Sequence, residues 1–177
     1  MAAAKTAVFW DKEYCPVPKG LNGEMVWRNI KSSLEKAGYH GPASITAYVD
    51  DETNRIQNHD LAFAGIKLGH VPGGGRGKGR ARHEAMRYDM WGWAVENEKS
   101  NLMVITKFVR YSTVDALRKR GWNVLLGWPE NGPGEISCCA TLTWSWKSLA
   151  AGGEAIGSKP ATCPSCLKLQ GTAAADQ

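Results

Sequence analysis

The chain has 177 residues, of which 43% are hydrophobic, and a formal net charge of +5. These values predict one globular domain with a buried core and exclude a chain that is disordered throughout. The basic excess favours anionic partners. No window is long and apolar enough to span a bilayer, so we expect no membrane insertion.

The N-terminal residues and the cysteine content indicate where in the cell the protein is located. Residues 1–6 run directly into the first predicted strand and leave no room for the apolar core of a signal peptide. We therefore expect a soluble intracellular protein in the cytoplasm, with the nucleus and the peroxisome as alternatives. Five cysteines without a secretory context are typical of thiols or metal ligands rather than of disulfides.

The first predicted strand ends in a carboxylate. Residues 7–11 are β-favouring and mostly apolar, the run stops at Asp11, and Pro16 and Pro18 follow. We expect Asp11 at the carboxyl end of a buried strand, where open parallel α/β sheets bind ligands and metal ions. An aspartate that only caps its own turn is the alternative.

A helix and a second strand come next. Asn22 is predicted to cap a helix over residues 23–38, whose last residue is a glycine stop. Residues 44–49 predict a strand that ends in an acidic run beginning at Asp50. A strand, helix, strand unit is a right-handed crossover with parallel strands, so Asp50 is expected at the same sheet edge as Asp11. A solvated acidic loop is the alternative.

A basic, glycine-rich loop is the one low-complexity stretch. Residues 53–64 are predicted to be irregular, residues 65–71 to form a third strand, and residues 72–82 to form the loop. The loop is not a nucleotide-binding phosphate loop, because Pro72 and Gly79 stand where that motif needs glycine and serine or threonine. We expect it to grip a phosphate backbone without reading sequence, and a solvated connector is the alternative. The residues expected to bind nucleic acid are Arg76, Lys78, Arg80 and Arg82.

A helix with an unusual acid follows the loop. Residues 83–97 carry apolar side chains on two flanks, which predicts a largely buried helix. Asp89 lies in its middle, and an ionised carboxylate is seldom buried without a cationic or metal partner. A salt bridge to Arg82, Arg87 or Lys107 is the alternative to a metal ion.

The second half of the chain repeats the rhythm of strand and helix. Strands are predicted at residues 101–106 and 122–127, with a helix at residues 112–121 between them that Ser112 would cap. This repeat favours a parallel sheet covered on both faces. Residues 141–146 predict a last strand or an apolar helical turn.

The C-terminal part is dominated by small and polar residues, which predicts a flexible tail over residues 152–177. Within it, Cys163 and Cys166 have the spacing of half a zinc knuckle. Cys138 and Cys139 are adjacent, which is a poor spacing for the second ligand pair. We therefore expect free thiols rather than zinc at Cys163 and Cys166.

A series of short motifs runs through the chain in a fixed order. They are Val8-Phe9-Trp10-Asp11, Cys15-Pro16-Val17-Pro18, Gly38-Tyr39-His40-Gly41, Gly65-Ile66-Lys67-Leu68, His70-Val71-Pro72, Asp89-Met90, Trp93-Ala94-Val95-Glu96-Asn97 and Leu117-Arg118-Lys119-Arg120-Gly121. In this order they resemble the NYN domain of the PIN-like nuclease superfamily. The likeness is to its plant proteins and to the branch of limkain, the meiosis regulator and mRNA stability factor. It covers roughly residues 6–151, which we take as the domain.

The resemblance implies an α/β fold. This is a PIN-like domain of three layers with a central, mainly parallel sheet of about five strands and helices on both faces. It also implies clustered carboxylates that hold Mg²⁺ or Mn²⁺ for endonucleolytic cleavage of RNA, with single-stranded RNA as the expected partner. Carried over by resemblance, Asp11 and Asp89 are catalytic residues and metal ligands, and Asp50 supports the metal.

The chain departs from the family pattern at several of these positions. Residues 105–109 lack the two carboxylates that the family has after its fourth strand, and Lys107 stands at one of their places. Tyr14 stands where the family often has asparagine or aspartate, and His83-Glu84 replaces an Asp-Lys pair. Lys107 would then occupy the place of the metal with its ammonium group and pair with Asp11 and Asp89.

We therefore expect a pseudoenzyme, an NYN domain with lost or weakened catalysis that retains RNA binding and acts in RNA metabolism or in the regulation of gene expression. One alternative is an active Mg²⁺- or Mn²⁺-dependent endoribonuclease in which Glu13, Asp50, Glu52 or Glu84 replaces the missing ligands. The other alternative is a protein-interaction scaffold without RNA affinity.

Overall fold

The computed structural model describes residues 3–50, 55–71, 78–97, 100–129 and 139–157. The strands are β1 (Thr6–Asp11), β2 (Ala43–Asp50), β3 (Lys67–Val71), β4 (Asn101–Ile105), β5 (Asn123–Trp128) and β6 (Leu142–Ser145). They form one sheet in the order β3-β2-β1-β4-β5-β6, and each pair of neighbours is parallel. The predicted α/β fold with a parallel central sheet is confirmed, with one strand more than the expected five.

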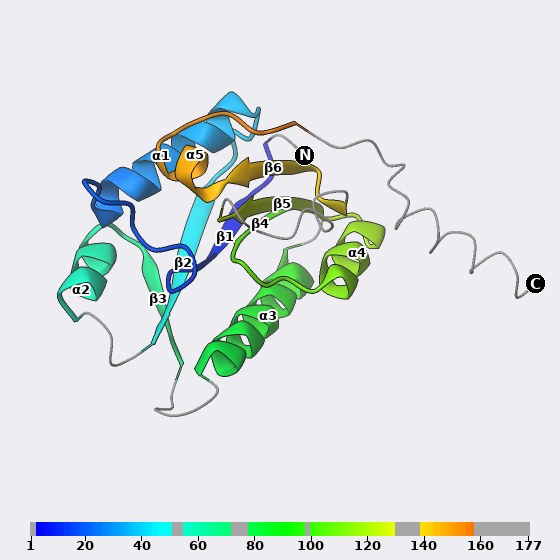
Figure 1. Cartoon of the computed structure of the whole chain (residues 1–177). Coiled ribbons are helices and arrows are strands. Elements are labelled where there is room, and N and C mark those ends of the chain that lie inside the picture. The colour runs from blue at the N-terminus through cyan, green and yellow to red at the C-terminus, as the bar shows by residue number, and fades with distance from the viewer. Residues whose placement is uncertain (1–2, 51–54, 72–77, 98–99, 130–138, 158–177) are drawn as a thin grey trace, which may run out of the picture.

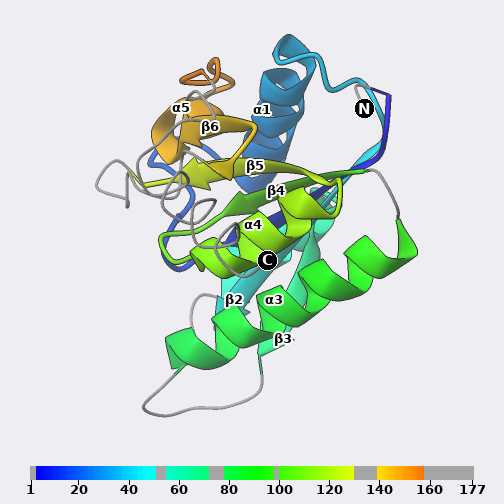
Figure 2. The ribbon, with the colours of Figure 1, turned by 90° about the vertical axis from the view of Figure 1, so that its right-hand side faces the viewer.

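The helices cover both faces of this sheet. They are α1 (Gly23–Lys36), α2 (Arg55–Phe63), α3 (Lys78–Glu96), α4 (Tyr111–Lys119) and α5 (Trp146–Ala150). Helices α1, α2 and α5 pack on one face, and α3 and α4 pack on the other (Figure 1). In the turned view, α3 runs beneath the sheet with α4 beside it (Figure 2). None of the helices in the described residues is both long and apolar enough to cross a membrane.

Strand β1 contributes to both cores because its side chains alternate between the two faces. Val8 and Trp10 belong to the core under α1, whereas Ala7 and Phe9 belong to the core over α3. All six residues of β1 are buried. This two-sided burial explains the continuous apolar run that the sequence shows before Asp11.

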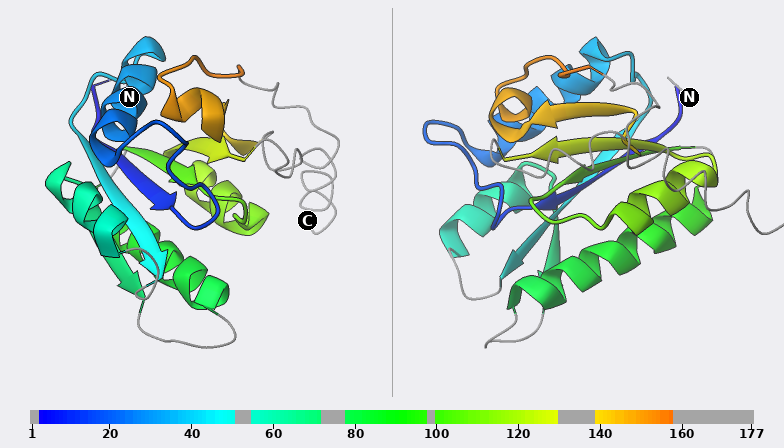
Figure 3. Two further views of the ribbon diagram at one scale, coloured as in Figure 1. Left: turned by 60° about the vertical axis from the view of Figure 1, so that its left-hand side comes forward. Right: turned by 45° about the vertical axis from the view of Figure 1, so that its right-hand side comes forward.

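The strand order places a crevice next to β1. From β1 the chain connects to β2 on one side, and the later strand β4 pairs with β1 on the other side, so the order of the strands reverses between β1 and β4. Figure 3 shows the blue strand β1 between the cyan β2 and the green β4. In open parallel sheets, loops diverge at the carboxyl ends of the strands at such a point and leave room for a ligand. Asp11 is the last residue of β1 at this point.

Helix α2 lies in the segment that was predicted to be irregular, and that prediction was wrong. The helix is anchored by Leu61, which is 1% exposed, and few other apolar residues mark it in the sequence. It packs closely on the start of α1, since a Cβ added to Gly23 would lie 2.8 Å from a terminal methyl group of Leu61. The glycine therefore permits the contact between the two helices.

The boundaries of α3 and α4 also differ from the prediction. Helix α3 begins at residue 78, so it takes up the last part of the basic loop. Ser112 does not cap α4, because the N-cap position is held by Arg110, which makes no capping hydrogen bond through its side chain. The predicted cap of α1 is confirmed, since the Asn22 side chain accepts a hydrogen bond from the backbone N–H of Met25.

The C-terminal part of the described chain continues past α5. The Ser33 hydroxyl donates to the carbonyl oxygen of Gly153, and the N–H of Ile156 donates to the carbonyl oxygen of Thr143. Residues 152–157 thus make hydrogen bonds with α1 and β6, although the tail was predicted to start at residue 152. The domain limits of 6–151 stay a prediction, and Cys163 and Cys166 lie outside the described residues.

Candidate functional site

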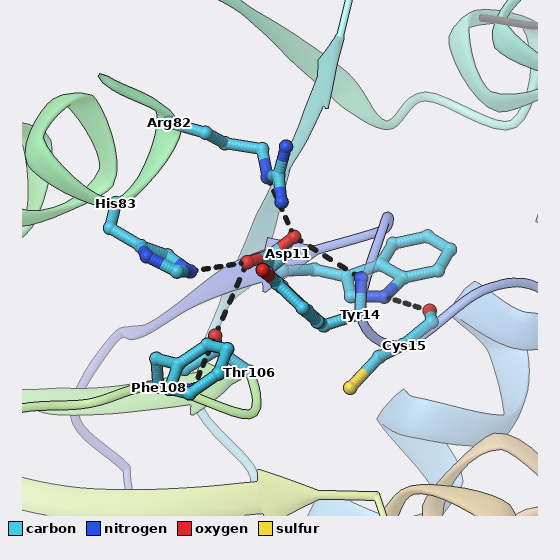
Figure 4. A network of polar contacts seen from close by, with 8 residues as sticks. Asp11, Tyr14, Cys15, Arg82, His83, Thr106 and Phe108 are labelled. Carbon is cyan, nitrogen blue, oxygen red and sulfur yellow. Dashed lines mark hydrogen bonds and ion pairs between the residues drawn. The ribbon is translucent and has the colours of Figure 1, made fainter. Parts of the chain in front are cut away.

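The carboxylate of Asp11 is the centre of the candidate site. It is 0% exposed, and four groups from three parts of the chain surround it (Figure 4). Tyr14 comes from the loop after β1, Arg82 and His83 come from the first turns of α3, and Thr106 follows the last residue of β4. The crevice between β1 and β4 therefore closes around one acidic side chain.

Both oxygens of this carboxylate accept hydrogen bonds. Oδ1 lies 2.8 Å from Nε of Arg82 and 3.4 Å from the backbone N of Tyr14. Oδ2 lies 2.9 Å from Nε2 of His83 and 3.3 Å from the hydroxyl oxygen of Thr106. Arg82 itself is only 3% exposed, so the structure buries an ion pair. A buried carboxylate without such partners would be costly, which explains why Arg82 is drawn inward.

The turn after β1 fixes the position of Asp11. The N–H of Cys15 donates to the carbonyl oxygen of Asp11 at 3.0 Å, and Nε1 of the buried Trp10 donates to the carbonyl oxygen of Cys15 at 2.8 Å. Burial raises the pKa of the Cys15 thiol, and the nearby charge of Asp11 adds to the increase. Cys15 is therefore a neutral core residue at physiological pH.

The ring of Tyr14 packs against several members of the site. It stacks on His83 with ring centroids 5.5 Å apart, meets the edge of Phe108 at 4.9 Å, and lies under the guanidinium of Arg82 at 5.3 Å. A Cβ on Gly79 would come within 3.3 Å of the Tyr14 hydroxyl, so glycine allows α3 to start this close to the ring. Tyr14 thus holds the two α3 side chains against Asp11 by stacking.

A pocket of about 500 Å³ opens beside this cluster. It lies between the first half of α3 and the segment after β4, and His83, Tyr14 and Phe108 form part of its wall. Phe108 is 51% exposed. The pocket is also lined by four basic side chains, Arg80, Arg87, Lys107 and Arg110, and by one acidic side chain, Glu84. The lining therefore has an excess of positive charge.

The single acid of this lining is engaged by arginines. Glu84 pairs with Arg87 one turn later in α3 and lies 4.0 Å from a guanidinium nitrogen of Arg110. The hydrogen bond from Arg87 lowers the pKa of Glu84, and the charges of Arg110 and Arg80 act in the same direction. Glu84 was one of the residues expected to replace a missing metal ligand, and here it neutralises basic side chains instead.

Asp89 does not line the pocket beside Asp11. It is exposed on α3, about two turns beyond Arg82, and its Oδ2 accepts a hydrogen bond from the Tyr48 hydroxyl at 2.6 Å. Burial and the bond to Asp89 raise the pKa of Tyr48, so the phenol stays protonated and donates. The expectation that Asp89 is buried was wrong, because Met86 and Met90 are the residues that face the sheet. The structure does not bring Asp89 together with Asp11.

Lys107 does not pair with Asp11. Its side chain is exposed, and its ammonium nitrogen lies 5.5 Å from the centroid of the Phe108 ring. Thr106, the residue directly after β4, is the one whose hydroxyl contacts the carboxylate. The cation that takes the expected place is Arg82, which sequence reasoning had assigned to the RNA-binding loop.

The remaining predicted site residues are placed only in part. Arg80 is exposed and lines the pocket. Arg76 lies outside the described residues. The backbone of Lys78 begins α3 and that of Asp50 ends β2, but their side chains are not among those described. His83 is the residue that sequence reasoning missed. Its place in the pair His83-Glu84, ahead of Asp89 in the same helix, gave no indication that its ring would reach Asp11.

The described residues do not fit a divalent metal ion. They contain no group of three or more His, Cys, Asp or Glu side chains arranged to hold one. A hard cation needs free oxygen lone pairs. The two oxygens of Asp11 already accept from a guanidinium, an imidazole, a hydroxyl and a backbone N–H, and the charge of Arg82 would repel a cation.

The fold and the pocket define a class of α/β proteins with a ligand crevice at the carboxyl edge of a parallel sheet. The family model of the NYN domain matches residues 5–141, and the chain therefore belongs to the NYN domain family. Within this family, the limkain-like and plant-type assignment stays a prediction.

Comparisons with individual proteins agree on the fold. The chain is similar to the crystal structure of a protein of unknown function from Vibrio parahaemolyticus, with a TM-score of 0.60 and 15% sequence identity. The match covers 81% of this chain and 93% of that chain. A likeness at this identity concerns the fold alone. No curated protein matches the chain.

Proposed function

We propose that this NYN domain binds single-stranded RNA and lacks the metal-dependent cleavage of its family. It then acts as a binding module in RNA metabolism or in the regulation of gene expression. Membership of the NYN family supports a nuclease-like, RNA-associated role. The loss of catalysis rests on one observation, the buried ion pair between Arg82 and Asp11.

This ion pair replaces what a metal ion would do for the carboxylate. The Arg82 guanidinium is permanently charged, and it satisfies Asp11 without any bound ion. A nuclease of this kind needs several converging carboxylates, because the metal must both activate water and neutralise charge on the phosphate. Among the side chains that the structure describes, no three His, Cys, Asp or Glu residues converge to hold a metal ion, and the charge of Asp11 is already neutralised.

The lining of the pocket supports RNA binding. Arg80, Lys107 and Arg110 are exposed basic residues that can neutralise phosphates, and such contacts give affinity without reading sequence. Phe108 offers a half-exposed ring at the same pocket, and bases of single strands stack on such rings. The combination of cations and an accessible ring is typical of single-strand binding surfaces.

Fluorescence anisotropy with a labelled oligoribonucleotide in EDTA tests this proposal. We expect binding that weakens steeply as salt rises, because counterions are released when phosphates are neutralised. The triple variant Arg80→Gln/Lys107→Gln/Arg110→Gln should bind much more weakly and depend less on salt. Lys147→Gln is the matched control, since Lys147 is exposed on α5, on the opposite face of the sheet.

If the triple variant and Lys147→Gln bind RNA equally well, the pocket is not the binding site. The absence of any RNA binding by the wild type would favour the scaffold alternative.

A further inference from the structure

His83 connects the buried carboxylate to the pocket. Its Nε2 lies 2.9 Å from Oδ2 of Asp11, and its side chain is 23% exposed and lines the pocket. Figure 4 shows the ring between Asp11 and the start of α3, with its second nitrogen away from the carboxylate. One ring nitrogen therefore makes a hydrogen bond with Asp11, and the other makes none with the residues that the structure describes.

The contact with Asp11 determines which nitrogen carries the proton. A carboxylate oxygen only accepts hydrogen bonds, so Nε2 of His83 must donate. In the neutral imidazole the other nitrogen, Nδ1, is then an acceptor with a free lone pair. Among the described residues, Asp11 is the hydrogen-bond partner of His83, so Nδ1 remains available to a ligand.

The ring is also held in orientation. The Tyr14 ring stacks on it at an interplanar angle of 20°, and the Phe108 ring meets it at 64° with centroids 5.5 Å apart. Thr106 shares Oδ2 of Asp11 with His83, and the Thr106 hydroxyl oxygen accepts from the N–H of Phe108 at 3.2 Å. The acceptor on His83 therefore has a fixed place in the pocket wall.

From this geometry we propose that the pocket is a ribonucleotide subsite, in which Nδ1 of His83 accepts a hydrogen bond from a ribose 2′-hydroxyl. The inference rests on the proposed RNA binding and adds to it a reason for preferring RNA over DNA. The phosphates lie against Arg80, Lys107 and Arg110, and the exposed ring of Phe108 packs on the sugar or the base. A cavity of about 500 Å³ is large enough for one nucleotide unit.

Nδ1 favours the sugar over the phosphate for a simple chemical reason. A phosphate oxygen is an acceptor and has no proton to give to a lone pair, whereas the 2′-hydroxyl is both donor and acceptor. The basic residues of the lining satisfy the phosphate instead. This arrangement also gives Asp11 a role without a metal ion, since it positions His83 and is itself neutralised by Arg82.

The test compares oligonucleotides of one sequence that differ only at the 2′ position. Wild-type protein in EDTA should bind the RNA about fivefold more tightly than the DNA, which is what one net hydrogen bond of about 1 kcal/mol gives. RNA with 2′-O-methyl groups should bind like the DNA, because the methyl group removes the donor. These comparisons use the wild-type chain and do not depend on the folding of a variant.

Binding by a His83 variant and the ¹⁵N spectrum of the wild-type histidines test the ribose contact independently. His83→Gln can still donate to Asp11 through its amide but lacks the acceptor at the place of Nδ1, so its preference for RNA over DNA should fall to near one. Lys147→Gln should keep the wild-type preference. In the ¹⁵N spectrum of the wild-type histidines, His83 should show a protonated Nε2 and an unprotonated Nδ1.

The outcomes separate the two proposals. Equal affinity for RNA and DNA, or a wild-type Nδ1 that carries the proton, overturns the ribose contact and leaves the proposed RNA binding in place. A preference for RNA that His83→Gln retains also overturns the contact. No binding of either nucleic acid overturns the proposed function itself.

Discussion

Nε of Arg82 lies 2.8 Å from Oδ1 of Asp11, and the two side chains are 3% and 0% exposed. This buried pair lies at the point where the order of strands in the sheet reverses and where the family resemblance implies a metal ion. The guanidinium balances the carboxylate in the folded state. Several expectations follow from the burial of both charges and of the groups around them.

Removal of the arginine should destabilise the fold strongly. Arg82→Met leaves Asp11 buried without its cation, and breaking a buried pair in this way costs about 3–5 kcal/mol of unfolding free energy. Urea denaturation measures the loss. Arg80→Met is the control, because Arg80 is exposed and its loss should cost less than about 0.5 kcal/mol. The double variant Asp11→Asn/Arg82→Met should be more stable than Arg82→Met. Equal stability of Arg82→Met and Arg80→Met would show that the pair is not buried as described.

Lys12 should make the stability depend on pH in the alkaline range. Its side chain is 4% exposed, and Nζ lies 3.2 Å from Oδ1 of Asn58. Burial lowers the pKa of Lys12, although the charge of Glu13 opposes the shift. The unfolded chain then binds a proton more tightly than the folded protein, so the contribution of Lys12 to stability rises as pH increases toward the unfolded value of about 10.4.

A pair of variants isolates this effect. The unfolding free energy of wild type minus that of Lys12→Met should increase between about pH 7 and about pH 10. The same difference for Lys147→Met should stay constant, because Lys147 is exposed. A difference for Lys12→Met that is flat or falls with pH would contradict the conclusion that burial lowers the pKa of Lys12.

Cys15 should be unreactive in the native protein. It is 0% exposed and burial raises the pKa of its thiol, so both access and the thiolate form are missing. After treatment with iodoacetamide at about pH 8, peptide mapping by mass spectrometry should find Cys15 unmodified, and modified once the chain is unfolded in urea. Rapid alkylation of native Cys15 would show that the turn after β1 opens.

Tyr48 and Asp89 should matter for stability rather than for RNA. Tyr48→Phe removes the hydrogen bond of 2.6 Å to Asp89 and should cost about 1 kcal/mol of unfolding free energy. Asp89→Asn should change RNA affinity by less than about twofold, because Asp89 does not line the pocket beside Asp11. A large loss of RNA affinity in Asp89→Asn would instead support the catalytic position that the resemblance assigned to this residue.

The sequence predicts the sheet well because its strands are buried on both faces. Residues 7–10 and 102–105 are all apolar, and the helices between successive strands require parallel pairing. Asp11 could be placed at a strand end for the same reason. Helix α2 was missed because its apolar residues form no clear helical repeat; of the side chains described in it, Leu61 is buried and Phe63 is exposed.

The sequence does not show which residues would contact Asp11 in the folded protein. Arg80 and Arg82 belong to one basic run, and nothing in the sequence says which of them turns inward. The answer depends on where α3 begins and on how Tyr14 packs against its first turns. Lys107 was the obvious substitute for a metal ion by position, yet Thr106 is the residue of this segment that contacts Asp11.

One assay decides whether Asp11 is paired with Arg82 or serves a metal ion: it follows binding and cleavage of a labelled single-stranded RNA, in Mn²⁺ and in EDTA. At matched ionic strength, the pairing of Arg82 with Asp11 predicts the same affinity in both buffers, within about twofold, and no cleavage with the protein in excess over the RNA. Mn²⁺-dependent cleavage that persists through purification and is abolished by Asp11→Asn would contradict the proposed loss of catalysis. It would mean that Asp11 serves a metal ion and that the ion pair with Arg82 is not its working state.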